Sequence, residues 1–142
     1  RVLQFAFISG LPDDLHLPHN YPRNCVVYTG THDNDTVIGW FRGGGVAATT
    51  LSEEARIRER QRALKYLGTD GKEINWDLIT LALMSVANTA IVPVQDIIGL
   101  GSVARMNTPG TEKGNWGWRF TSDMLTEKVR DRLGQLTAVY GR

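Results

Sequence analysis

The sequence has one cysteine, almost no net charge and no long apolar run, and each scarcity excludes a class of protein. Cys25 alone cannot form a disulfide within the chain, which argues against a small secreted fold held by disulfides. The 16 Lys and Arg residues are scattered among 15 Asp and Glu residues and leave a formal net charge of +1. We therefore expect neither nucleic acid nor an anionic membrane as a partner. No apolar stretch approaches the roughly 20 residues that cross a bilayer.

Apolar sequence, in contrast, is sufficient for one sizeable core. The chain has 142 residues, 42% of them hydrophobic, which is near the norm for a globular domain. It opens at Arg1 and passes at once into residues 2–7, which have the apolar content of a strand. We therefore expect this chain to be part of a longer protein.

Three short apolar segments, at residues 2–7, 26–29 and 90–94, are predicted to be strands. The segments between them are long enough for the crossover connections that parallel strands need. Amphipathic helices are interleaved with the strands, which favours a parallel sheet of the α/β class. Three strands cannot close a barrel, so the chain is either a small open α/β domain or part of a larger one.

Two helices are predicted between the second and third strands. The first begins at the capping box of Thr50 and Glu53 and ends at Gly68, and its narrow apolar face favours an outer position. The second is capped by Asn75 and repeats apolar pairs every four residues, which is typical of a helix packed against a sheet. A last helix, at residues 125–140, has these apolar residues on one face: Leu125, Val129, Leu133 and Leu136.

A dense polar run, His32-Asp33-Asn34-Asp35, follows the strand at residues 26–29. Catalytic groups are often mounted where a buried strand of a parallel sheet ends. A carboxylate there can stabilise a cationic transition state or orient a hydroxyl, with the imidazole as a second hydrogen-bonding group. The alternative is a structural loop in which Asn34 or Asp35 caps the next helix. The residues alone leave both interpretations open.

Metal binding is not expected from the spacing of the ligand-type residues. A calcium loop that starts at Asp33 fails, because Val37 and Gly44 stand where oxygen ligands belong. The candidates near the N-terminus match no zinc template, and prolines shape the loop between them. Those candidates are Asp13, Asp14, His16, His19 and Cys25.

Residues 99–118 form a long segment that is rich in glycine and aromatic residues, and such loops are usually functional or mobile. Residues 99–104 match the dinucleotide fingerprint G-x-G-x-x-A, but Pro109 soon breaks the helix that a pyrophosphate would need. A nucleotide site is therefore a minor alternative. Aromatic rings beside Asn, Gln and Asp suit the faces of a sugar, although closing the core is the commoner role of a single Trp. These aromatic residues are Trp40, Trp116 and Trp118.

Six segments, in order and spanning nearly the whole chain, are more specific than any single motif. They are Val-Leu-Gln-Phe-Ala-Phe at 2–7, Leu-Pro-His-Asn-Tyr at 17–21, Val-Val-Tyr-Thr-Gly-Thr-His-Asp-Asn-Asp-Thr at 26–36, Pro-Val-Gln-Asp-Ile-Ile-Gly-Leu-Gly at 93–101, Arg-Met-Asn-Thr-Pro-Gly-Thr at 105–111 and Asn-Trp-Gly-Trp-Arg at 115–119. Together they closely resemble the 4-α-glucanotransferases, the family also called amylomaltases or disproportionating enzymes.

The resemblance implies an α-amylase-type (β/α)8 TIM barrel, of which residues 1–142 supply strands six to eight as the C-terminal part of one catalytic domain. It also implies retaining transfer of α-1,4-glucan segments between malto-oligosaccharides, without a metal or cofactor. The nucleophile Asp and the acid/base Glu would lie on strands four and five, upstream of Arg1. This piece therefore needs the rest of the barrel and is expected to be inactive alone. The implied location is the cytoplasm, or a plastid in a plant or alga.

By the same resemblance, Asp33 corresponds to the transition-state stabiliser at the end of strand seven. Residues 8–16 depart from the family's usual sequence, so the shape of the loop after strand six is not implied. A non-catalytic glucan-binding module that keeps the cleft aromatics is the alternative function. The expected substrate-binding residues are His32, Asn34, Gln95, Asp96 and Asn107.

Overall fold

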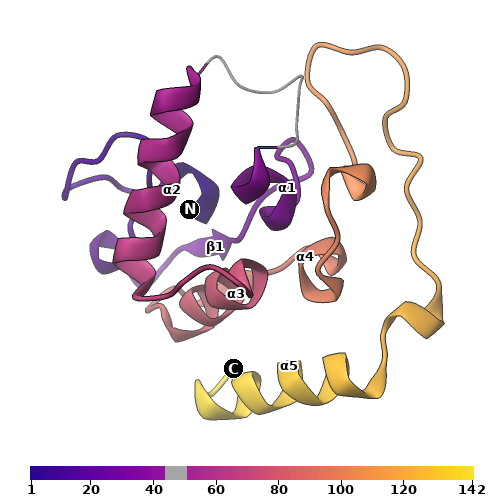
Figure 1. The fold of residues 1–142 in the computed structure, drawn as a ribbon. Helices are drawn as coiled ribbons and strands as arrows, with labels where there is room; N and C mark the ends of the chain where they lie inside the picture. Colours follow the sequence, from indigo (N-terminus) through magenta and orange to yellow (C-terminus); the bar gives the residue numbers. More distant parts are fainter. Residues whose placement is uncertain (44–50) are drawn as a thin grey trace.

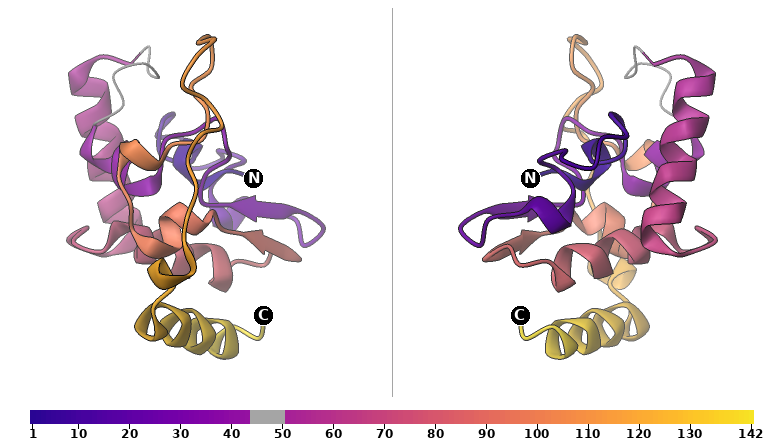
Figure 2. Two further views of the ribbon diagram at one scale, coloured as in Figure 1. Left: turned by 90° about the vertical axis from the view of Figure 1, so that its right-hand side faces the viewer. Right: turned by 90° about the vertical axis from the view of Figure 1, so that its left-hand side faces the viewer.

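The computed structural model, which describes residues 1–43 and 51–142, contains a sheet of two short parallel strands. Strand β1 (Val26–Tyr28) pairs in parallel with β2 (Thr89–Ile91), and the strands lie side by side in Figure 2. An isolated parallel bridge joins Val2 to Tyr28. Three parts of the chain thus run parallel, as the α/β interpretation requires.

Helices make up most of the rest of the molecule (Figure 1). The α-helices are α1 (Val37–Arg42), α2 (Glu53–Leu67), α3 (Ile74–Met84), α4 (Val94–Ile98) and α5 (Glu127–Val139). The 3₁₀ helices are η1 (Leu3–Phe5), η2 (Pro18–Asn20), η3 (Ser102–Ala104) and η4 (Ser122–Met124). A long connection, orange in Figure 1, leaves η3 and returns along one side of the molecule to α5.

The core is organised on the two sides of α3, most of whose residues are buried. One side joins a cluster with Leu3, Phe7 and Val27 of β1. The other side presents a second cluster to α5, which lies along the bottom of Figure 1. The apolar face predicted for the last helix is confirmed in part by three residues that pack there: Val129, Leu133 and Leu136.

The prediction of a strand at residues 2–7 is wrong beyond Val2. Leu3–Phe5 is a 3₁₀ helix, and the amides of Phe5 and Ala6 donate to carbonyls three residues earlier. Leu3, Ala6 and Phe7 are buried while Phe5 is exposed, so the buried positions follow a helical spacing rather than strict alternation. An apolar run this short fits both patterns, and tertiary packing decided between them.

The third strand is also shorter than predicted. β2 ends at Ile91, and Pro93 then occupies the N-cap of α4, where its missing N–H is no loss. Gln95 and Asp96 therefore lie in the first turn of a short helix instead of at the end of a strand.

Helix ends were predicted with mixed success. Gly68 ends α2 in the left-handed conformation, as predicted, but the N-cap is Ser52, whose hydroxyl accepts from the Ala55 amide. Thr50 lies outside the described residues. Asn75 is not a cap: it lies within the first turn of α3, buried, and donates to a backbone carbonyl of α4. Glu127–Val139 is capped by Thr126.

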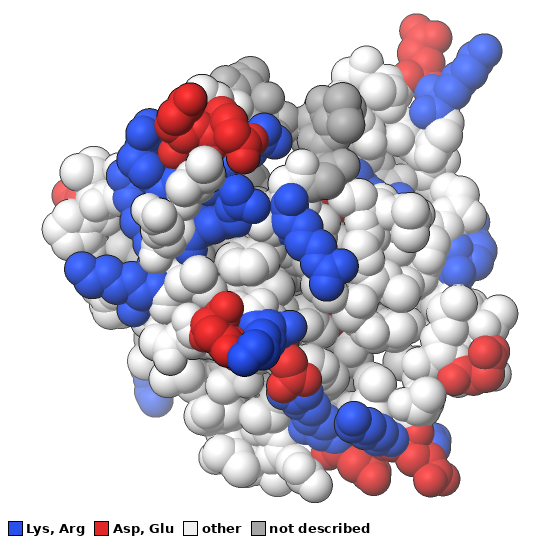
Figure 3. All heavy atoms as spheres, in the orientation of Figure 1, with Lys and Arg blue, Asp and Glu red and all other residues white. Residues whose placement is uncertain are grey.

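Charged side chains of both signs lie side by side over α2 on the face shown in Figure 3. Arg56 and Arg60 both pair with Glu53 there. Such exposed pairs contribute little to stability, so α2 is held by its buried face instead. Within residues 1–43 and 51–142, no helix is long and apolar enough to cross a membrane.

Candidate functional site

The loop at residues 30–36, which joins β1 to α1, is anchored at its far end. The Thr36 hydroxyl caps α1 by accepting from the Gly39 amide at 3.0 Å, so the cap considered for Asn34 or Asp35 belongs to Thr36. Close by, the Gln4 side-chain amide donates to the Asp35 carbonyl at 2.9 Å. These contacts leave the middle of the loop to project outward.

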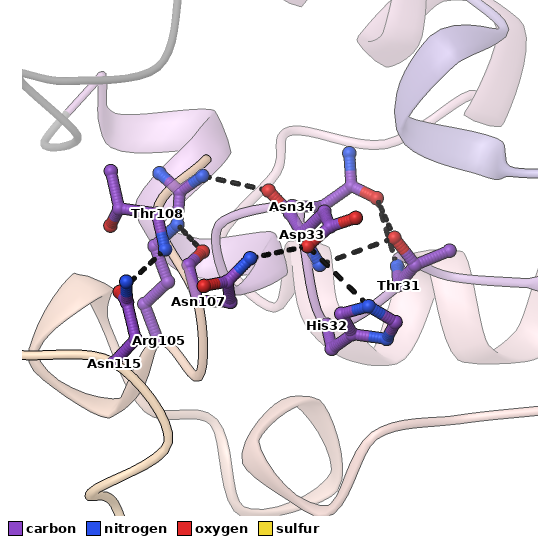
Figure 4. Close-up of polar contacts among 8 residues, drawn as sticks. All are labelled: Thr31, His32, Asp33, Asn34, Arg105, Asn107, Thr108 and Asn115. Atoms are coloured by element: carbon purple, nitrogen blue, oxygen red, sulfur yellow. Dashed lines mark hydrogen bonds and ion pairs between the residues drawn. The ribbon is translucent and has the colours of Figure 1, made fainter. Parts of the chain in front are cut away.

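Asn34 shapes the projecting part of the loop. Its Oδ1 accepts from the Thr31 amide at 2.9 Å and from the Thr31 hydroxyl at 2.8 Å. A side chain bonded in this way to nearby backbone holds a tight turn. The turn presents the two side chains between Thr31 and Asn34 to solvent: that of His32 is 57% exposed and that of Asp33 is 52% exposed. Figure 4 shows both at the tip of the loop.

The Asp33 carboxylate is oriented by two neighbours. Asn107 Nδ2 donates to Asp33 Oδ1 at 2.6 Å, and His32 Nε2 lies 3.4 Å from the same oxygen. Among the described residues, the structure records no hydrogen bond to Oδ2. One carboxylate oxygen is thus held by the protein, and the side chain as a whole stays half exposed.

The segment after α4 folds back onto this loop and supplies Asn107. Arg105 bridges the two segments: Nη2 donates to the Asp33 carbonyl at 2.7 Å and Nε donates to the Asn107 carbonyl at 2.7 Å (Figure 4). The Trp116 ring lies 5.1 Å from the His32 ring, and its backbone has a φ of 62°. Left-handed backbone is uncommon for a bulky residue and marks a constrained position.

Asp96 lies behind the loop and is only 2% exposed. Its carboxylate accepts from the Thr29 hydroxyl at 2.6 Å and from the Val37 amide at 2.8 Å, so it links the end of β1 to the start of α1. Burial raises the pKa of Asp96 to about 6, although both hydrogen bonds act in the opposite direction. The buried Gln95 donates to the Ala104 carbonyl at 3.2 Å.

Two cavities flank the loop. The larger, of about 320 Å³, is bordered by Asp33, Trp40 and Arg105. The smaller, of about 160 Å³, is bordered by His32, Gln95, Asp96 and again Arg105. Asn34 borders both, and Asn107 reaches the site through its bond to Asp33. The structure therefore gathers all six predicted site residues around one loop, although they come from three separate parts of the sequence.

Sequence reasoning missed Arg105 and the bond from the Ser102 hydroxyl to Asp35 Oδ2 at 2.7 Å. These contacts join positions some 70 residues apart, for which no local pattern exists. Trp40, considered either for contact with a sugar or for closing the core, donates its indole N–H to the buried Glu59 at 3.0 Å. Burial raises the pKa of Glu59.

The alternative sites have ordinary structural explanations. Within the described ranges, no group of three His, Cys, Asp or Glu side chains is placed to hold a metal. His16 Nδ1 accepts from the Val2 amide at 2.9 Å, and Asp14 accepts from the His16 amide at 2.8 Å. The glycine fingerprint at residues 99–104 leads only into the three residues of η3, which is too short for a pyrophosphate-binding helix.

The sequence of this chain is similar to those of known proteins. The family model described as 4-alpha-glucanotransferase matches residues 1–126. The chloroplastic/amyloplastic 4-alpha-glucanotransferase of Arabidopsis thaliana is 51% identical over 145 residues, which cover 99% of this chain and 23% of that protein. The 4-alpha-glucanotransferase of Synechocystis is 48% identical over 144 residues, which cover 100% of this chain and 26% of that protein.

Among solved structures, an amylomaltase from Streptococcus agalactiae in complex with acarbose is similar to the whole chain. The TM-score is 0.85 at 30% identity, covering 100% of this chain and 27% of that one. The chain thus spans about a quarter of the length of the relatives that it matches.

Proposed function

We propose, because the chain belongs to the 4-alpha-glucanotransferase family, that it is the C-terminal part of a catalytic domain that transfers α-1,4-glucan segments between malto-oligosaccharides. Residues 1–142 would supply strands six to eight of a (β/α)8 barrel. The parallel alignment of Val2, β1 and β2 supports three successive barrel strands. These residues would then pack against the rest of the same barrel. A cytoplasmic location, or a plastid in a plant or alga, is part of the proposal.

The observation that carries the proposal is the oriented, half-exposed carboxylate of Asp33 beside His32 and Asn107. In retaining transfer, a carboxylate from the rest of the barrel attacks the anomeric carbon while an acid protonates the leaving glucan oxygen. The 4-hydroxyl of an acceptor then displaces the enzyme carboxylate and returns its proton to the same acid/base group. Asp33 would stabilise the positive charge that the anomeric centre develops in each step.

The remaining predicted residues divide into two roles by their place in the site. His32, at the exposed tip of the loop, and Asn107, which bonds to the Asp33 carboxylate, would contact the glucan hydroxyls. The other three bond to the segments around the site and would hold it in shape: Asn34, Gln95 and Asp96. Their original assignment to substrate contact stays a prediction.

The direct test is disproportionation of maltotriose by the full-length protein, followed by chromatography of the products. We expect a ladder of longer malto-oligosaccharides together with shorter products, because each transfer lengthens one chain and shortens another. Residues 1–142 alone should give no products, since the nucleophile and the acid/base would lie outside them. A full-length protein that leaves maltotriose unchanged would contradict the proposal.

A second candidate, a glucan-binding module without catalysis, is favoured by the Trp116 ring, which is 51% exposed and adjacent to His32. An exposed ring offers an apolar face to a sugar. This function predicts saturable binding of maltoheptaose by calorimetry with no change in its chain length. Product formation in the same sample excludes it.

A further inference from the structure

Arg105 stands where η3 gives way to extended chain and joins two segments that are otherwise far apart in the sequence. Its guanidinium bonds to backbone carbonyls of both Asp33 and Asn107. The side chains of these two residues bond to each other. The three residues therefore form a closed ring of hydrogen bonds in which one guanidinium holds both ends of the Asp33–Asn107 contact (Figure 4).

We propose that Arg105 is a positioning residue that fixes the Asp33 carboxylate in its catalytic orientation. This inference rests on the proposed function of Asp33. Arg105 bonds to the backbone carbonyl of Asp33 and not to its carboxylate. Among the described residues, the carboxylate forms its ion pair with His32. The guanidinium thus orients the group without forming an ion pair with it, so its negative charge stays available to a cationic transition state.

The geometry of the ring requires an arginine. A guanidinium is planar and presents several N–H donors in a fixed fork, so two carbonyls from different segments can be bonded at once in a defined relation. A lysine ammonium reaches as a single point on a flexible stem and would keep at most one of the two carbonyls in place. Arg105→Lys therefore keeps the charge and removes the alignment.

A second contact between the same segments acts at the base of the loop. Ser102 donates to Asp35, and a Cβ on Gly39 would lie within 2.5 Å of the side chains of both residues. This close approach holds the two segments together even when Arg105 is changed. Loss of Arg105 should therefore loosen the tip, where Asp33 lies, and leave the loop attached.

The experiment measures maltotriose disproportionation by the full-length protein and compares Arg105→Lys with Arg142→Lys. Arg142 is a matched control because it also bonds to backbone carbonyls, those of Leu83, Ser85 and Ala87, far from the site. We expect Arg105→Lys to lower kcat by about 10- to 100-fold, since a misplacement of about 1 Å can cost that much. KM should change less than about twofold, because Arg105 holds Asp33 in the transition state rather than the bound glucan.

Arg105→Ala provides a second test, the recovery of kcat by added guanidinium, which is not expected if Arg105 only stabilises the fold. Guanidinium at about 10–50 mM, far below denaturing concentrations, should raise its kcat several-fold by refilling the ring. Arg142→Ala should not respond. The inference would be overturned if the kcat of Arg105→Lys lay within twofold of the parent. It would also be overturned if both Arg105 variants lost kcat together with thermal stability and guanidinium rescued neither.

Asp33→Asn, measured beside these variants, separates the two proposals. If Asp33→Asn is inactive while the Arg105 variants are normal, only the positioning role is wrong. If Asp33→Asn stays active, the catalytic role of Asp33 is wrong, and the positioning role is overturned with it.

Discussion

Asp33 and Asp96 are two aspartates of the same site that lie in opposite environments. Asp33 is half exposed at the tip of a loop, with one oxygen held by Asn107. Asp96 is almost wholly buried, and both of its oxygens accept hydrogen bonds, from Thr29 and Val37. An exposed carboxylate can meet a substrate, whereas a buried one with both oxygens bonded ties protein segments together. Environment, not residue type, thus separates the proposed catalytic role of Asp33 from the structural role of Asp96.

The largest difference should appear when Asp33 is changed to Asn in the full-length protein. The amide keeps the shape of the side chain but removes the negative charge opposite the developing cation, so kcat should fall by about 10³-fold or more. The melting temperature should stay within about 2 °C, because an exposed side chain contributes little to stability. Asp131→Asn, on the exposed surface of α5, is the control. A near-normal rate for Asp33→Asn would remove the distinction between the two aspartates.

Asp96→Ala should show the converse, a loss of stability. It leaves the Thr29 hydroxyl and the Val37 amide buried without their acceptor. Each unsatisfied group costs about 1–3 kcal/mol, so the total destabilisation should be about 2–6 kcal/mol. Urea unfolding of the full-length protein measures it, with Asp131→Ala as control. An unchanged unfolding midpoint would show that the carboxylate does not tie the segments together.

Ionisation of Asp96 gives a definite sign to the pH dependence of the free energy of unfolding. Its folded pKa, about 6, lies above the value of about 3.9 for an unfolded chain. The folded state therefore binds more protons between these values, and the stabilisation from protonated Asp96 is lost as pH rises from about 4 through 6. Two pKa units correspond to at most about 3 kcal/mol.

Asp96→Asn, which cannot ionise, isolates this effect. The stability of the parent minus that of Asp96→Asn should fall as the pH rises from 4 to 7, by up to about 3 kcal/mol. Urea unfolding at a series of pH values measures both proteins under the same conditions, so other titrating groups cancel. A difference that rises with pH would show that Asp96 is better stabilised as a carboxylate than its burial indicates.

Much of this architecture could be predicted from local patterns. The helix that ends at Gly68 and the apolar face of α5 follow from capping chemistry and periodicity, which act within a few residues. Residues 2–7 were predicted as a strand, because a short apolar run carries no information about which packing partner it will meet. The two aspartates follow the same kind of apolar run, so their different burial became visible only in the fold.

The candidate site was harder to predict than the fold because its contacts are long-range. Asp33 could be selected from its place after β1 and from the family resemblance. Its hydrogen bond to Asn107 spans 74 positions, and that from Arg105 spans 72. No sequence period links such positions. Arg105 begins one of the segments that carry the resemblance, but its contact with the loop became visible only when the structure placed its guanidinium between two carbonyls.

Asn107→Ala should produce the smallest of these effects and tests how finely Asp33 must be oriented. The change removes the hydrogen bond to Asp33 Oδ1 but leaves the Asn107 backbone carbonyl for Arg105. A single hydrogen bond contributes about 0.5–1.5 kcal/mol, which corresponds to a loss of kcat of about 2- to 10-fold. Asn115→Ala, which affects the same segment without touching Asp33, is the control for loop disorder. If Asn107→Ala lowers kcat as far as Asp33→Asn does, Asn107 participates in the chemistry itself. If it has no effect on kcat or KM, Arg105 and the turn held by Asn34 are sufficient to orient the carboxylate.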